Sequence, residues 1–97
     1  MATRVTRRTS IRFRADVACR AVGGEFYALT ADNAFHAVTD PVGAFVLGVV
    51  EARPGVTIEQ LANDVEQGFD TQGANVRMDL RAFVRQLLEK GLLEPVR

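Results

Sequence analysis

The sequence predicts a small α+β domain in which a three-stranded antiparallel β-meander is followed by three helices. Two observations predict this class. Short runs of strand-forming residues separated by turn residues occupy residues 13 to 39, whereas apolar residues recur at helical spacing from residue 41 onward. The length of 97 residues is that of one domain, and strands followed by helices are typical of α+β folds.

The three strands are expected at 17–22, 25–30 and 34–39. The pair Gly23-Gly24 separates the first two, and a two-residue glycine spacer supplies the positive φ angles of a tight hairpin turn. The tripeptide Ala-Asp-Asn at 31–33 separates the second from the third, and Asp and Asn stabilise turns by bonding their own backbone. In such a meander the third strand lies at an edge of the sheet.

Helices are expected at about 41–52, 58–68 and 75–90. Asp40 followed by Pro41 starts the first, because aspartate caps the free amides and proline tolerates the first helical position. This helix is apolar nearly all round, which predicts that it is central and buried. Thr57 and Gln60 form a capping-box pair for the second.

The chain has zero net charge because a basic N-terminal segment offsets an acidic remainder. Five arginines precede the first acidic residue: Arg4, Arg7, Arg8, Arg12 and Arg14. The remainder carries 7 basic and 12 acidic residues, a formal charge of −5. Residues 1–12 are therefore predicted to be a flexible basic arm, with the domain proper at 13–97.

Membrane insertion and secretion find no support in the sequence. The longest apolar run, Val42–Val50, is too short to cross a bilayer, and no apolar segment follows the N-terminal arginines. The expected location is the cytoplasm.

The inventory for catalysis is poor. Nucleophile–base systems need a Ser or Cys with a positioned His, and the chain has a single histidine, His36, on a predicted edge strand. No phosphate loop, HExxH or CxxC motif occurs. We expect no enzyme activity, no cofactor and no metal site. Cys19 is interpreted as a small core residue, and His36 either as a half-exposed strand residue or as a peptide contact.

The third helix carries a row of arginines. Arg77, Arg81 and Arg85 are spaced at i, i+4 and i+8, beside an apolar face and together with Leu88. Arginine forks pair bidentately with carboxylates, so the row suits a peptide with acidic residues. The alternative is a solvated helix flank.

The ordered set of motifs resembles the PqqD-like family, which includes pyrroloquinoline quinone biosynthesis protein D and the recognition elements of ribosomally made, post-translationally modified peptides. The matching segments are the hairpin 21–29, the strand-to-helix junction 40–44, and the segments 57–62, 69–70, 79–84 and 87–93. The chain departs from the family at Thr39-Asp40, where a Leu-Asn pair is common.

The resemblance implies a winged helix-turn-helix-like fold and a non-catalytic peptide chaperone. Such domains bind the leader of a precursor peptide as an added strand beside the third strand, against the third helix, and present it to a modifying enzyme, often a radical SAM protein. Strand addition needs an unprotected edge, and 34–39 contains neither Lys nor Pro. The expected contacts are Phe35, His36, Ala37, Val38, Arg77, Arg81, Val84, Arg85 and Leu88.

Two other functions remain open at this point. A winged-helix DNA-binding domain would turn the arginine row and the N-terminal arginines to the duplex, although the charge of −5 on the remainder argues against nucleic acid. A structural subunit would pair the same edge strand with a second copy and form a homodimer.

Overall fold

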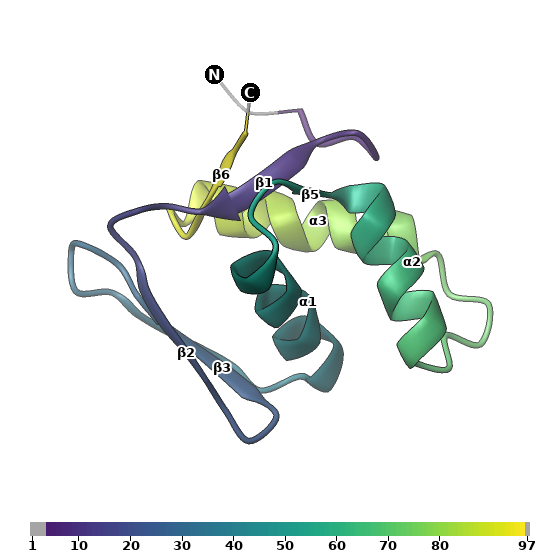
Figure 1. Cartoon of the computed structure of the whole chain (residues 1–97), viewed down its shortest axis with the longest axis horizontal. Coiled ribbons are helices and arrows are strands. Elements are labelled where there is room, and N and C mark those ends of the chain that lie inside the picture. Colours follow the sequence, from purple (N-terminus) through teal and green to yellow (C-terminus); the bar gives the residue numbers. More distant parts are fainter. Residues whose placement is uncertain (1–3, 97) are drawn as a thin grey trace.

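The computed structural model describes residues 4–96 as an α+β fold, which confirms the predicted class. Figure 1 shows the arrangement of its elements. In chain order they are β1 (Ser10–Phe13), β2 (Ala18–Val22), β3 (Glu25–Leu29), β4 (Phe35–Val38), α1 (Pro41–Ala52), β5 (Val56–Thr57), α2 (Ile58–Gly68), α3 (Val76–Glu89) and β6 (Leu93–Pro95).

The predicted meander is present as the antiparallel sheet β2-β3-β4. Gly23 has a φ of 60° in the first turn, and Asn33 has a φ of 67° in the second. Both turns therefore use the left-handed backbone region that Gly and Asn reach most easily. Phe26 and Ala28 of β3 are buried on the inner face of this sheet.

A second antiparallel sheet, β5-β1-β6, was not predicted. Its central strand is β1, where Ile11 is completely buried and the Arg12 Nε donates to Glu94 Oε2 of β6 at 2.7 Å. Val5 is buried as well. The prediction of a flexible arm is therefore wrong for residues 10–12, which belong to the folded domain; residues 1–3 lie outside the described residues.

The helix starts follow the predicted capping chemistry. Asp40 accepts a hydrogen bond from the Gly43 N–H at 2.8 Å, with Pro41 as the first residue of α1. Thr57 and Gln60 form both hydrogen bonds of a capping box at the start of α2. These caps satisfy amides that have no partner within the helix.

The core lies around α1, which packs against β3 and β1 on one side and against α2 on another (Figure 1). Its largest fully buried side chains are Phe26, Ile11, Leu47, Ile58, Leu61, Leu92, Val46, Val50 and Val84. The prediction that the first helix is central is confirmed. Within residues 4–96, no helix has the length and apolar character needed to span a membrane.

Candidate functional site: an open strand edge and an adjoining pocket

The first feature of the candidate site is the outer edge of β4. The strand order β2-β3-β4 leaves one side of β4 without a strand partner in the part of the chain that the structure describes. The segment contains no lysine or proline that would protect it. The prediction that the third strand of the meander is an edge strand is confirmed.

The backbone register defines which groups of β4 are free. The Thr30 N–H donates to the Ala34 carbonyl at 3.0 Å, and hydrogen-bonded pairs alternate along an antiparallel ladder. Even-numbered residues of β4 therefore bond to β3, whereas the N–H and C=O groups of Phe35 and Ala37 point away from the sheet. These two residues offer the hydrogen bonds that an added strand requires.

The side chains of β4 divide between two faces. His36 and Val38 pair with buried residues of β3 and lie on the inner face, where His36 Nε2 is buried and has no hydrogen-bond partner within residues 4–96. Phe35 lies on the outer face, is 65% exposed and stacks on Tyr27 with ring centroids 5.8 Å apart. Ala37 is exposed. An added strand would therefore meet a different surface on each face.

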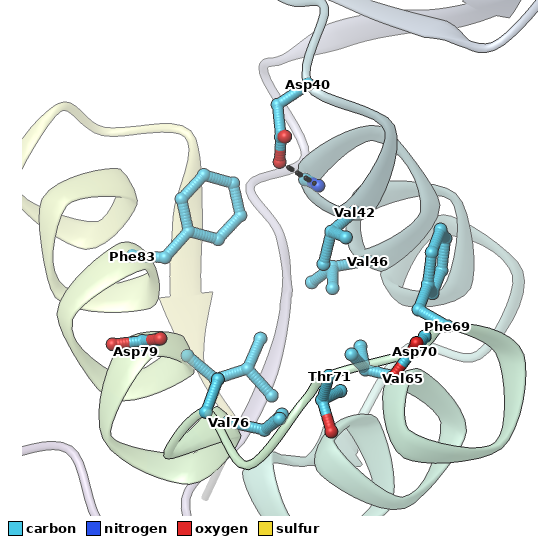
Figure 2. Close-up of a pocket in the computed structure, with 13 residues that line it drawn as sticks. Asp40, Val42, Val46, Val65, Phe69, Asp70, Thr71, Val76, Asp79 and Phe83 are labelled. Atoms are coloured by element: carbon cyan, nitrogen blue, oxygen red, sulfur yellow. Dashed lines mark hydrogen bonds between the residues drawn. The ribbon is translucent and has the colours of Figure 1, made fainter.

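The second feature is a pocket of about 410 Å³ that adjoins the end of β4. We call it the α1–α3 pocket. Figure 2 shows Val42 and Val46 of α1 across from Val76 and Phe83 of α3, with Phe69 at the end of α2. The lining residues are Asp40, Val42, Gly43, Val46, Val65, Phe69, Asp70, Thr71, Ala74, Val76, Asp79, Leu80 and Phe83. The wall is thus mostly apolar.

Gly43 joins the strand edge to the pocket. A Cβ atom at this position would lie 2.9 Å from Val38 Cγ1 and 3.5 Å from Phe83 Cζ. The absence of a side chain therefore lets the end of β4, the start of α1 and the middle of α3 approach one another. Gly43 lines the pocket and lies against Val38, so the pocket begins next to the end of β4.

The charged groups of the pocket are all acidic. Asp40, Asp70 and Asp79 lie around its wall (Figure 2), and no basic residue lines it. Asp40 accepts the Gly43 N–H, and Asp70 accepts the Gln72 N–H at 3.1 Å. None of the three carboxylates forms an ion pair with another residue of the described chain. The helix N-termini of α1 and α3 compensate part of the charge of Asp40 and Asp79, but within residues 4–96 no basic side chain pairs with any of the three.

The arginine row lies elsewhere on α3. Arg77 Nη2 donates to Glu59 Oε1 at 2.6 Å, and Arg77 Nη1 pairs with Glu66 Oε1 at 3.3 Å. The hydrogen bond from Arg77 lowers the pKa of Glu59 and raises the pKa of the guanidinium. Arg77 thus ties α3 to α2. The expectation that this side chain faces a peptide conflicts with these contacts.

The other expected residues of α3 do not line the pocket either. Val84 is completely buried in the core, so it offers no surface to a ligand. Arg81 is half-buried, Arg85 is exposed and Leu88 packs against the core. The sequence reasoning instead missed Asp79 and Phe83, which face the pocket. Phe83 follows the apolar spacing of α3, and only the position of α1 shows that this side chain lines a pocket and not the closed core.

Cys19 is not a reactive group. Its thiol donates to Glu51 Oε2 at 2.8 Å, and burial together with this carboxylate raises the pKa of Cys19 to about 12. A thiol with so high a pKa holds its proton near neutral pH and is a poor nucleophile. Among residues 4–96 no group of three or more His, Cys, Asp or Glu side chains is placed to hold a metal ion.

Two solved structures are similar in fold to this chain. The chain is similar to TbiB1, solved in complex with the TbiA(beta) leader peptide, at 25% identity and a TM-score of 0.73 over 89% of this chain and 98% of that one. It is also similar in fold to the heterocyclase TruD, at 18% identity and a TM-score of 0.63, over 91% of this chain and 12% of that one. No curated protein matches the sequence.

The profile of the family described as coenzyme PQQ synthesis protein D (PqqD) matches residues 36–93. This match runs from His36 of β4 to Leu93 of β6, so it includes most of β4 and all residues that line the pocket. It confirms the resemblance inferred from the ordered motifs. The chain belongs to the PqqD family.

Proposed function

We propose that this protein is a non-catalytic adaptor that binds the leader of a ribosomally made precursor peptide and presents it to a modifying enzyme. The observation that carries the proposal is the free edge of β4 beside the α1–α3 pocket. Family membership and the similarity to TbiB1, which was solved with a leader peptide, support it. The leader would extend the sheet as a strand and pack side chains toward the pocket.

The choice of β4 over the opposite edge strand β2 depends on the pocket. Both strands have a free side in the sheet order β2-β3-β4. Asp40, which lines the pocket, lies two residues beyond the end of β4. A peptide on β4 would therefore gain backbone hydrogen bonds and reach the α1–α3 pocket of about 410 Å³. The pocket beside β2, lined in part by Ala18, Cys19 and Arg20, is smaller, about 320 Å³.

A modifying enzyme is the proposed second partner. The same fold accounts for 12% of the heterocyclase TruD chain, which supports an arrangement in which this type of domain works beside an enzyme. The family resemblance suggests a radical SAM protein as one such enzyme. The proposed place of action is the cytoplasm.

DNA binding is less well supported by the arrangement of charges. Arg77, the first arginine of the row on α3, is engaged with Glu59 and Glu66. The pocket beside β4 carries three aspartates, which would repel a phosphate backbone. A second copy of the chain pairing on β4 remains an outcome that the following experiment would reveal.

The test is an NMR titration with the leader segment of a precursor peptide encoded beside the gene of this chain, together with affinities from fluorescence anisotropy. We expect micromolar or tighter binding and shift changes in β4, α1 and α3. Ala37→Pro removes an N–H that points out from β4 without breaking the ladder to β3. Loss of one backbone hydrogen bond should weaken binding about three- to tenfold.

A matched control exists at the other edge of the sheet. The even-numbered residues of β3 form their backbone hydrogen bonds with β4, so the odd-numbered ones bond to β2. Ala21 of β2 lies opposite Phe26, an even-numbered residue, so its N–H points outward from the sheet. Ala21→Pro should leave the affinity unchanged. Equal weakening by both variants, or no shift changes in β4, would overturn the proposed mode of binding. Shift changes that depend on protein concentration alone would indicate a homodimer.

A further inference from the structure

The α1–α3 pocket has the size and lining of a site for side chains rather than of a packing defect. Its volume of about 410 Å³ lies within the range of pockets that bind small ligands. Two aromatic rings, Phe69 and Phe83, contribute to its wall. Phe69 is held by an edge-to-face contact with Phe45 of α1, with ring centroids 5.3 Å apart. This contact orients the Phe69 ring in the apolar wall.

The charges around this wall restrict what can enter. Asp40, Asp70 and Asp79 lie on different elements, namely the start of α1, the loop after α2 and the first turn of α3. All three aspartates are exposed, so they act on a bound charge as surface groups whose attraction is weakened by salt. An acidic side chain at the pocket would meet like charges, whereas a basic side chain would meet three carboxylates that have no ion-pair partner within residues 4–96.

The direction of β4 brings a bound strand to this point. Asp40 follows the last residue of β4, Val38, by two positions. Extended residues advance about 3.3 Å each and alternate between faces. A strand that pairs with β4 and continues past Val38 therefore runs toward Asp40 at the pocket and turns every second side chain to the same face. Side chains two positions apart can then lie at the apolar wall and near the aspartates.

We propose that the pocket selects leader peptides by charge as well as by apolar contact: it takes one large apolar side chain of the bound strand, and the three aspartates attract a lysine or arginine close to it in the peptide. This inference rests on the proposed function and adds the chemistry of the peptide. It reverses the expectation drawn from the arginine row, which favoured a peptide with acidic residues.

The test uses a display library of random peptides of about 12 residues, which span roughly 40 Å when extended, selected on the wild-type protein. The same library is selected on the double variant Asp70→Asn/Asp79→Asn. Asparagine keeps the shape and one acceptor oxygen of each side chain, removes the charge and replaces the other oxygen by an NH2 donor. A control variant, Asp16→Asn/Glu89→Gln, removes two exposed charges that do not line the pocket.

We expect the wild type and the control to enrich peptides with a large apolar residue near a lysine or arginine. The pocket variant should keep the apolar preference and lose the basic one. It should bind the selected peptides about three- to tenfold more weakly at low salt. The difference should vanish at about 1 M salt, where the Debye length is about 3 Å.

The charge preference can also be tested by changing the peptides and keeping the wild-type protein, so that the result does not depend on how the protein variants fold. Selected peptides in which lysine and arginine are replaced by glutamine should bind about three- to tenfold more weakly. Unchanged affinity, or enrichment of acidic peptides, would overturn the charge selection. If the library yields no peptides, or if the selected peptides bind Ala37→Pro as tightly as the wild type, the proposed function itself fails. Peptides that need β4 but show no basic preference refute only the further inference.

Discussion

A comparison of two glycines in α1 tests whether β4, α1 and α3 really meet closely. Gly48 has open space around it, and Gly43 does not. Gly48→Ala should stabilise the protein by about 1 kcal/mol, because alanine is the better helix former. Gly43→Ala adds the same methyl group 2.9 Å from Val38 Cγ1. Carbon atoms pack at about 3.5–4.0 Å, so Val38 must move by roughly 0.6 Å or more.

Overpacking of this kind costs about 1–3 kcal/mol, which offsets the gain in helix propensity. The structure leaves little room for relief, because the valine side chain is stiff and Asp40 Oδ2 would lie 3.3 Å from the new methyl group. Gly43→Ala should therefore be less stable than Gly48→Ala by about 1–3 kcal/mol. In a domain of this size, 1 kcal/mol shifts Tm by about 4–8 °C.

Thermal and urea unfolding of the two variants provide the measurement, with peptide affinity as a second readout. Gly48→Ala should bind the leader as the wild type does. Gly43→Ala displaces Val38 at the binding edge and should bind it more weakly. If Gly43→Ala proves as stable as Gly48→Ala and binds equally well, then β4, α1 and α3 do not approach one another closely at Gly43.

Two further predictions concern titrating groups. Arg77→Lys removes the planar fork that lowers the pKa of Glu59, so urea unfolding should show lower stability near neutral pH. The variant should also lose less of its free energy of unfolding than the wild type on acidification below about pH 4.3, the ordinary pKa of Glu. An equal loss in both proteins would contradict this role of Arg77. Because the pKa of Cys19 is about 12, alkylation of its thiol should stay slow to about pH 10 and become faster in Glu51→Gln. Alkylation as fast as in the urea-unfolded chain would refute this.

The meander and the helix starts could be predicted because their signals are local. Gly23 and Asn33 mark turns by their backbone preferences, and Asp40 and Thr57 mark helix starts by capping. The sheet β5-β1-β6 has no such signal. Its strands have two to four residues each and come from distant parts of the chain, too short for periodicity to separate a strand from a loop. The burial of Ile11 therefore became visible only in the assembled fold.

The candidate site was predicted in part for a related reason. Strand order identifies β4 as an edge, since a meander must end there. Helical spacing places Arg77 and Arg81 on one side of α3, but it does not say which neighbour covers that side. The partners of Arg77 belong to α2, and the residues that face the pocket are known only once α1 is in place.

The pairing of β1 with β6 has a consequence for how this fold can be carried by other proteins. The two strands are antiparallel, and the Val96 N–H donates to the Ser10 carbonyl at 2.8 Å, so the chain enters and leaves the domain side by side. A host protein can hold the domain by this single point of attachment, as an insertion in one loop. The edge of β4 belongs to the other sheet, so such an attachment leaves it open.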